Sequence, residues 1–239
     1  MENLENKEFL LSQIRLFDEL PMSDIKVIDH MSVMRPVKRG TLILSPLQQT
    51  RALFLLKKGQ VRLYRANEQG RQFTIDILTD GNVFGQTESF SLTDDDTYVE
   101  AMLDTYLCVM AKEQFEVFLA QRPELAMKLL SLLSERLRYT CDLSQQIALA
   151  DVKSRVLYLL LRLSDRAPVQ KGDWRRVNMR LTHADVATMV GASRETVSLV
   201  FSELRKTGVL KKRLLSYMLN AEKARKAMDL PDLSEAESY

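Results

Sequence analysis

The segment Leu181–Leu204 constrains the fold of this chain more than any other. Its apolar residues recur at the three- and four-residue spacing of two short amphipathic helices. These residues are Val186, Met189 and Val190 in the first helix and Val197, Val200, Phe201 and Leu204 in the second. Gly191 separates them, because glycine turns there without a steric penalty. Thr182 and Ser193 stand where N-caps belong, and Asp185 completes a Thr-x-x-Asp capping box. The pattern predicts a helix-turn-helix.

The polar positions of the second helix indicate what this motif binds. Arg194, Glu195 and Ser198 lie off the apolar stripe at the start of that helix, the part that reaches base edges in the major groove of DNA. Arginine can donate two hydrogen bonds to guanine, and glutamate can accept one from cytosine. The alternative is a helical hairpin whose charges are merely solvated. The residues expected at DNA are Thr182, His183, Ser193, Arg194, Glu195, Thr196, Ser198, Lys211, Lys212 and Arg213.

The segment Gly208–Leu219 predicts two short strands around a basic turn, which is a wing whose cations meet phosphates. The run Val190-Gly-Ala-Ser-Arg-Glu-Thr-Val197, the Leu204-x-x-x-Gly208 spacing and the wing closely resemble the recognition region of the Crp–Fnr transcription regulators. Nearly the whole chain shares the resemblance. It implies a regulator that binds pseudo-palindromic double-stranded DNA as a homodimer and works with RNA polymerase. Family members that read TGTGA carry an arginine where this chain has Leu199, so a thymine methyl or a less constrained base pair is expected there.

Charge is unevenly distributed along the 239 residues. The formal net charge is +2, but residues 1–150 carry −4, residues 151–230 carry +9 and residues 231–239 carry −3. The basic segment contains the helix-turn-helix, as a DNA-binding surface requires.

No catalytic triad, phosphate-binding loop, Rossmann glycine run or metal-ligand spacing is present, which argues against an enzyme. We expect a cytoplasmic protein without a membrane segment, since it has neither an apolar signal sequence nor a membrane-length apolar run.

Short β-like runs separated by turn residues precede this region. They are Thr41–Leu44, Ala52–Leu56, Val61–Tyr64, Phe73–Leu78, Val83–Phe84, Tyr98–Met102 and Tyr106–Met110. Their spacing predicts a small antiparallel barrel or roll. The Leu56–Tyr64 and Asp80–Gly85 stretches resemble the cyclic-nucleotide-binding-type β-roll of the Crp–Fnr family. A ligand sensor is one interpretation, and a scaffold that binds nothing is the other. The pocket residues implied are Phe84, Gly85, Gln86, Thr87 and Arg136.

The resemblance argues against cyclic AMP as the ligand. Members that bind it carry a glutamate for the ribose and an Arg-Ser pair for the phosphate. This chain has Gln86 at the glutamate position and Asp94–Thr97 where Arg-Ser is expected, and three adjacent carboxylates repel a phosphate. Two cysteines are too few for an iron–sulfur cluster, and His30 and His183 are poorly placed for haem. No cofactor is expected.

Arg136 leaves open the possibility of an organic-acid effector. In the 2-oxoglutarate-responsive branch of the family an arginine of the long helix meets the ligand, and Arg136 matches its place. The second arginine of that pocket aligns with Asp94–Asp96, so the match is incomplete. Arg136 can instead pair with Glu135 or a carboxylate of a partner chain, or set the register of a dimer.

A long helix after Pro123 carries a heptad pattern that predicts dimerisation. The seam is formed by Leu129, Leu133, Arg136, Thr140, Leu143 and Ile147, with Leu132 and Leu137 packing against the β-roll of the same chain. The alternative is a core helix within one chain. Asp151 is expected to cap the next helix, and Ser23 an earlier one.

These patterns predict an α+β fold of four parts. They are a β-roll sensor domain with flanking helices (1–122), a dimerisation helix (123–150), a winged helix-turn-helix domain (151–229) and a disordered acidic tail (230–239). The function expected is sequence-specific transcription regulation, with a small-molecule effector other than cyclic AMP left open. A cyclic-nucleotide-binding-type module that acts on a protein partner is the rival.

Overall fold

The computed structural model describes residues 7–48, 50–87, 89–164, 173–177, 179, 181–213 and 216–228. The chain folds into two compact units, Met1–Tyr139 and Thr140–Tyr239. The expected acidic tail lies outside the described residues. Among the described helices, none combines the length and apolar character needed to cross a membrane.

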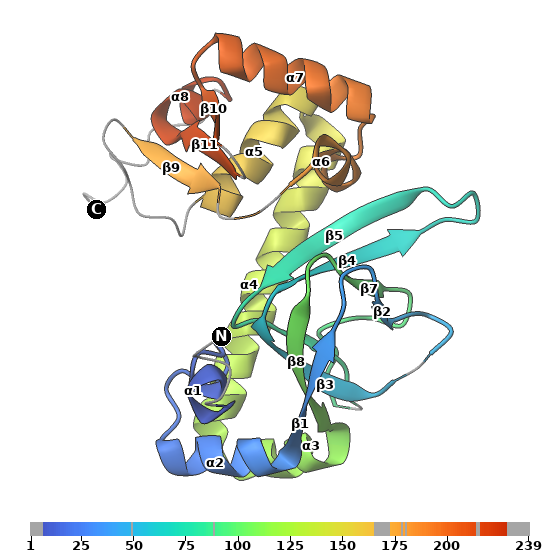
Figure 1. Ribbon diagram of the computed structural model, residues 1–239, viewed down its shortest axis with the longest axis vertical. Coiled ribbons are helices and arrows are strands. Elements are labelled where there is room, and N and C mark those ends of the chain that lie inside the picture. The colour runs from blue at the N-terminus through green and yellow to red at the C-terminus, as the bar shows by residue number, and fades with distance from the viewer. Residues whose placement is uncertain are drawn as a thin grey trace. The chain divides into compact units, whose positions relative to one another are not determined.

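The first unit contains the predicted antiparallel roll, built from two four-stranded sheets (Figure 1). One sheet has the order β1-β8-β3-β6 and the other β2-β7-β4-β5. The strands are β1 (Ser32–Val37), β2 (Leu42–Leu44), β3 (Ala52–Lys58), β4 (Gln60–Ala66), β5 (Gln72–Thr79), β6 (Val83–Gly85), β7 (Tyr98–Ala101) and β8 (Thr105–Ala111). Each predicted run is a strand, and β1 is an additional one. Because β1 is an edge strand, it tolerates Pro36, which has no N–H to donate.

Strand β3 is buried on both faces and organises two clusters of the core. Its Phe54 and Leu56 face the cluster between the two sheets, where Phe54 stacks on Phe84 with 5.0 Å between ring centroids. Its Leu53 and Leu55 face the opposite cluster, formed with helices α1 (Lys7–Ser12), α2 (Met22–Met31), α3 (Lys112–Ala120) and α4 (Pro123–Leu149). A strand covered on both faces reads as a continuous apolar run rather than an alternating one, as Ala52–Leu56 does.

Ser23 was expected to cap an N-terminal helix, but the structure gives that helix a different start. Helix α2 begins at Met22, after Pro21, and Ser23 lies inside its first turn without capping it. Its first turn is instead fixed by Asp24, whose carboxylate accepts hydrogen bonds from Arg122 Nε at 2.9 Å and Nη2 at 2.7 Å. The Arg122 guanidinium also lies 3.7 Å from the ring centroid of Phe118.

The long helix α4 exists as predicted, and part of its predicted seam is buried within the same chain. Leu129 is only 4% exposed and belongs to the core of its own unit, with Leu132 and Leu133 packed against the same cluster. Leu137, expected to pack on the roll, is 67% exposed. A different stripe with the same heptad spacing is exposed along the helix, and it comprises Met127, Leu130, Ser134, Leu137, Cys141, Ser144 and Ala148.

The second unit surrounds helix α5 (Val152–Ser164). Asp151 caps it as expected, since its Oδ1 accepts a hydrogen bond from the Ser154 amide at 2.7 Å. The remaining elements are β9 (Trp174–Val177), α6 (His183–Val190), α7 (Arg194–Lys206), β10 (Leu210–Arg213), β11 (Ser216–Asn220) and α8 (Ala221–Lys226). The predicted wing strands are β10 and β11, and β9 completes an antiparallel sheet of order β10-β11-β9. Strand β9 is an additional strand beyond those predicted.

Candidate nucleic-acid interface

The turn between α6 and α7 forms through the side chains that the sequence indicated. Thr182 Oγ1 accepts a hydrogen bond from the Asp185 amide at 3.1 Å, and Asp185 Oδ2 accepts one from the Thr182 amide at 2.7 Å. Gly191 ends α6 with φ 62° and ψ 46°, a left-handed conformation that glycine adopts without strain. Ser193 Oγ then accepts from the Thr196 amide at 3.1 Å and starts α7. The helix-turn-helix is confirmed in its local detail.

Helix α7 separates into a buried face and an exposed one. Val197, Val200, Phe201 and Leu204 are buried. Arg194 and Glu195, in its first turn, are exposed, and so is Leu199, of which 73% is accessible. Ser198 is half-buried between the two faces. A guanidinium, a carboxylate and an apolar side chain are therefore available together for contacts with base edges.

His183 links α6, α7 and the wing through both ring nitrogens. Its Nδ1 lies 2.8 Å from Ser198 Oγ, and its Nε2 lies 3.4 Å from the hydroxyl of Tyr217 on β11. Its ring centroid is 4.8 Å from that of Phe201. Burial lowers the pKa of His183, and the positive charges of Arg205, Lys212 and Arg194 lower it further.

Tyr217 was not predicted as part of this site. It is separated from His183 by 34 positions in the sequence, so no local pattern brings the two together. The only sequence signal is an aromatic residue in the second wing strand.

The wing presents its basic residues on two different faces. In the register of β10 and β11, Lys211 is paired with Met218, whereas Lys212 is paired with Tyr217. Side chains of cross-strand partners share a face, so Lys212 lies on the side of Tyr217 and His183. The Nζ atom of Lys211 lies 4.0 Å from the ring centroid of Trp174. The exposed Arg213 follows at the end of β10.

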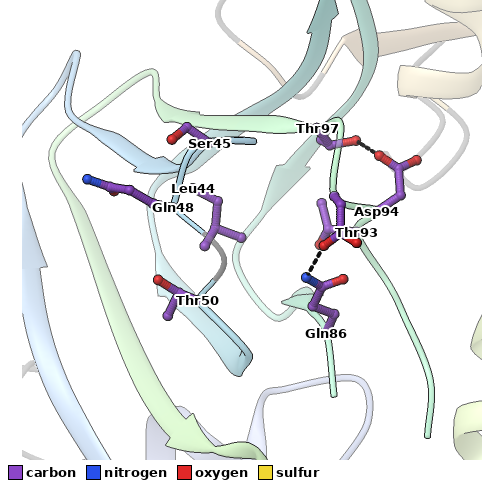
Figure 2. A pocket seen from close by; sticks show the side chains of 9 residues that line it. Leu44, Ser45, Gln48, Thr50, Gln86, Thr93, Asp94 and Thr97 are labelled. Carbon is purple, nitrogen blue, oxygen red and sulfur yellow. Dashed lines mark hydrogen bonds between the residues drawn. The ribbon is translucent and has the colours of Figure 1, made fainter. Parts of the chain in front are cut away.

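A polar pocket opens on the roll near the position where the family resemblance implied a ligand. Figure 2 shows residues after β2 on one side of it, and Gln86 with the Thr93–Thr97 segment on the other. Its lining comprises Leu44, Ser45, Gln48, Thr50, Gln86, Thr93, Asp94, Asp95 and Thr97. Within the described part of the chain, these lining groups are hydroxyls, amides and carboxylates around one leucine, without a cationic side chain.

The polar groups of this pocket already bind one another. Gln86 Nε2 donates to Asp95 Oδ1 at 2.6 Å, and Asp94 accepts from Thr97 Oγ1 at 2.6 Å and from Arg65 Nη2 at 2.5 Å. Burial opposes ionisation of Asp94, but the bonds from Thr97 and Arg65 outweigh it and lower the pKa of that carboxyl. An aspartate whose ionised form is stabilised therefore lies where the family resemblance implied the phosphate-binding pair.

Of the five residues expected to line an effector pocket, Gln86 alone lines this one. Phe84 belongs to the core between the sheets, and Thr87 is buried. Gly85 has φ +104°, and a Cβ built there would lie 2.2 Å from the carbonyl oxygen of Ala52, so its role is structural. Arg136 lies on α4 and does not line this pocket. Glu135, its suggested partner, forms an ion pair with Arg15 at 2.9 Å.

Two family models match the chain. A cyclic nucleotide-binding domain matches residues 34–122, and a Crp-like helix-turn-helix domain matches residues 154–224. The global nitrogen regulator of Synechococcus elongatus is 30% identical over 182 residues, which are 74% of this chain and 82% of that protein. A CRP-like cAMP-activated global transcriptional regulator of Mycobacterium tuberculosis is 26% identical over 199 residues, 83% of this chain and 89% of that one.

Solved structures share the fold. A CooA mutant from Carboxydothermus hydrogenoformans superposes with a TM-score of 0.74 at 20% identity, over 84% of this chain and 89% of that one. FixK2 from Bradyrhizobium japonicum superposes with a TM-score of 0.71 at 21% identity, over 82% of this chain and 96% of that one. At these identities the likeness establishes architecture alone.

Proposed function

The chain belongs to the Crp–Fnr family of transcription regulators, and from this premise we propose that it binds a pseudo-palindromic operator as a homodimer. The observation that carries the proposal is the first turn of α7, where Arg194 and Glu195 are exposed on a helix held by its buried face. Residues 151–230, which contain this helix, carry a net charge of +9. Phosphate attraction supplies affinity, and the two side chains supply base contacts.

The exposed stripe of α4 supports the homodimer. Its apolar and small side chains recur every three and four residues from Met127 to Ala148, which is the spacing of a coiled-coil seam. Leu130 and Leu137 are 56% and 67% exposed in the single chain. We assign the dimer seam to this stripe rather than to Leu129 and Leu133, which pack in the core of their own unit. A two-fold dimer presents its recognition helices about one helical turn of DNA apart.

The roll is proposed not to take cyclic AMP. Among the described residues, the lining of the pocket contains no cationic side chain, and Asp94 and Asp95 stand where the family resemblance implies phosphate donors. Two modes of control remain within this proposal: an effector of another chemical class, or control by the amount of the protein. Any effector acts by binding the DNA-competent arrangement more tightly than the other. Contact with RNA polymerase is proposed from the family alone.

Sequencing the DNA fragments that the purified chain retains from its own genome tests this function. The expected result is a two-fold symmetric motif with half-sites about 10–11 base pairs apart, bound by a dimer in light scattering. A chain that is monomeric at micromolar concentration and retains genomic and random fragments equally contradicts the proposal.

A further inference from the structure

The hydroxyl of Ser198 contacts two groups but has only one proton to donate. Its Oγ donates to the backbone carbonyl of Arg194 at 2.9 Å and lies 2.8 Å from His183 Nδ1. With its proton directed at the carbonyl, the oxygen can only accept from His183. This arrangement corresponds to the tautomer of His183 that carries its proton on Nδ1.

The other side of the imidazole is compatible with this assignment, because a tyrosine hydroxyl can donate as well as accept. Burial and three nearby cations lower the pKa of His183, which favours the neutral ring with a single proton near pH 7. With the proton on Nδ1, the Nε2 atom is an acceptor, and the hydroxyl of Tyr217 can donate to it. In this tautomer the hydrogen bonds form a directed chain from Tyr217 through His183 and Ser198 to Arg194.

We propose that His183 is a positioning residue that makes Ser198 an acceptor, and not a donor, toward DNA. The inference rests on the proposed DNA-binding function. Ser198 stands on the recognition helix beside Arg194 and Leu199, both of which are exposed. With its proton committed to Arg194 and one lone pair to His183, the hydroxyl offers DNA its second lone pair.

The consequence is a preference for bases that donate in the major groove. Adenine N6 and cytosine N4 present an amine there, whereas guanine O6 and N7 and thymine O4 present acceptors. An acceptor facing Ser198 meets a lone pair and loses its hydrogen bond to water. One net hydrogen bond corresponds to about a fivefold difference in affinity.

The position of the imidazole proton tests the first step on the unmodified chain. His30 and His183 are its only histidines, so long-range ¹⁵N–¹H NMR spectra contain two imidazoles, and a His30→Asn variant assigns them. The expected tautomer of His183 has the proton on Nδ1. A proton on Nε2 overturns the proposal, because Ser198 would then have to donate to Nδ1.

Base preference tests the second step. His183→Asn keeps an N–H donor near Nδ1, whereas His183→Leu removes it, and Ser198→Ala removes the hydroxyl. Each variant competes for operators that carry all four bases at each position of the half-site. Wild type and His183→Asn are expected to prefer A or C over G or T about fivefold at one position, and the other two variants are expected to lose that preference.

The outcomes separate this proposal from the function on which it rests. An unchanged preference in His183→Leu or in Ser198→Ala overturns the role of His183 while leaving the regulator intact. Failure of wild type to distinguish any operator from random DNA overturns both. Thermal melting verifies the fold of each variant. If His183→Leu does not fold, the tautomer of His183 and the base preference of Ser198→Ala still test the proposed role of His183.

Discussion

Lys211 and Lys212 are consecutive residues of β10, yet their side chains lie on opposite faces of the wing. Lys211 is paired across the sheet with Met218, and its ammonium stacks on Trp174. Lys212 is paired with Tyr217, and its charge helps to lower the pKa of His183 beside the recognition helix. The sequence predicted the same phosphate contact for both lysines. Their different neighbours point to different roles.

Lys212→Ala is expected to weaken binding to operator and random DNA alike, because a phosphate contact carries no sequence information. The dependence of log affinity on log salt should become shallower by about 1. Lys211→Ala is the matched control, expected to keep the salt dependence and to lose about 0.5–1 kcal/mol of stability with its cation–π contact. Titrations at several salt concentrations measure both. Equal salt slopes in the two variants would contradict the assignment of the phosphate contact to Lys212 rather than Lys211.

Arg194→Ala is expected to cost roughly 1–3 kcal/mol of operator binding and to change random-DNA binding much less. The reason is geometric: Arg194 is exposed in the first turn of α7, where a guanidinium reaches guanine O6 and N7. Competition between operator and random duplexes gives the ratio directly. A loss of the same size on both duplexes would assign Arg194 to the phosphates.

Cys141 allows the dimer seam to be located. It is exposed and lies on the stripe that contains Leu137, whereas the other cysteine, Cys108, is buried. In a parallel pair of helices, seam positions face their twins closely enough for a disulfide. Mild oxidation is expected to produce a covalent dimer that reducing agent reverses, and Cys141→Ser is expected to prevent it.

The matched control moves the thiol by one residue. Thr140 is also exposed, and it belongs to the seam inferred from sequence. A Thr140→Cys/Cys141→Ser variant should cross-link far less than wild type on electrophoresis without reducing agent. More cross-linking through residue 140 than through Cys141 would support the seam predicted from the sequence, which contains Thr140.

The proposed dimer seam shows which features of α4 could be predicted from the sequence and which could not. Two heptad stripes, one through Leu129 and one through Leu130, run along α4 with the same spacing, and periodicity alone cannot rank them. The choice depends on which stripe the chain buries itself, and Leu129 is in its own core. The existence of the helix was therefore predictable, but its orientation about its axis was not.

The same division holds for the site. Thr182 and Ser193 accept hydrogen bonds from amides a few residues away, and Gly191 adopts a left-handed backbone conformation. Because these roles are local, the sequence predicted them. The partnership of His183 with Tyr217 depends on the wing folding back, and β1 was missed because Pro36 is atypical of a strand. Both features depend on contacts between residues far apart in the sequence, which local sequence patterns do not show.

Cyclic AMP is expected to give no saturable heat when titrated into the purified chain. The phosphate would have to replace the bonds of Asp94 to Arg65 and Thr97, and it would meet the carboxylates of Asp94 and Asp95. Isothermal calorimetry at physiological salt makes the measurement. Saturable binding at micromolar concentration would show that this carboxylate-lined pocket rearranges for a phosphate.

Asp24 and Arg122 are expected to make the first unit sensitive to acid. The two hydrogen bonds from Arg122 lower the pKa of Asp24 below its ordinary value of 3.8. The unfolded chain therefore binds more protons than the folded one near that pH, so stability rises with pH there. The contribution is fully present above about pH 3.8 and is lost as pH falls through the lowered pKa of the folded state.

Asp24→Asn should consequently reduce the free energy of unfolding by about 1–3 kcal/mol at pH 7, and the difference from wild type should shrink toward pH 2–3. Glu19→Gln is the matched control, because Glu19 pairs with Lys128 on the surface and its side chain is 81% exposed. Its replacement is expected to have a smaller effect. Denaturant unfolding at both pH values makes the comparison. A penalty for Asp24→Asn that does not change with pH would mean that the hydrogen bonds persist without the negative charge.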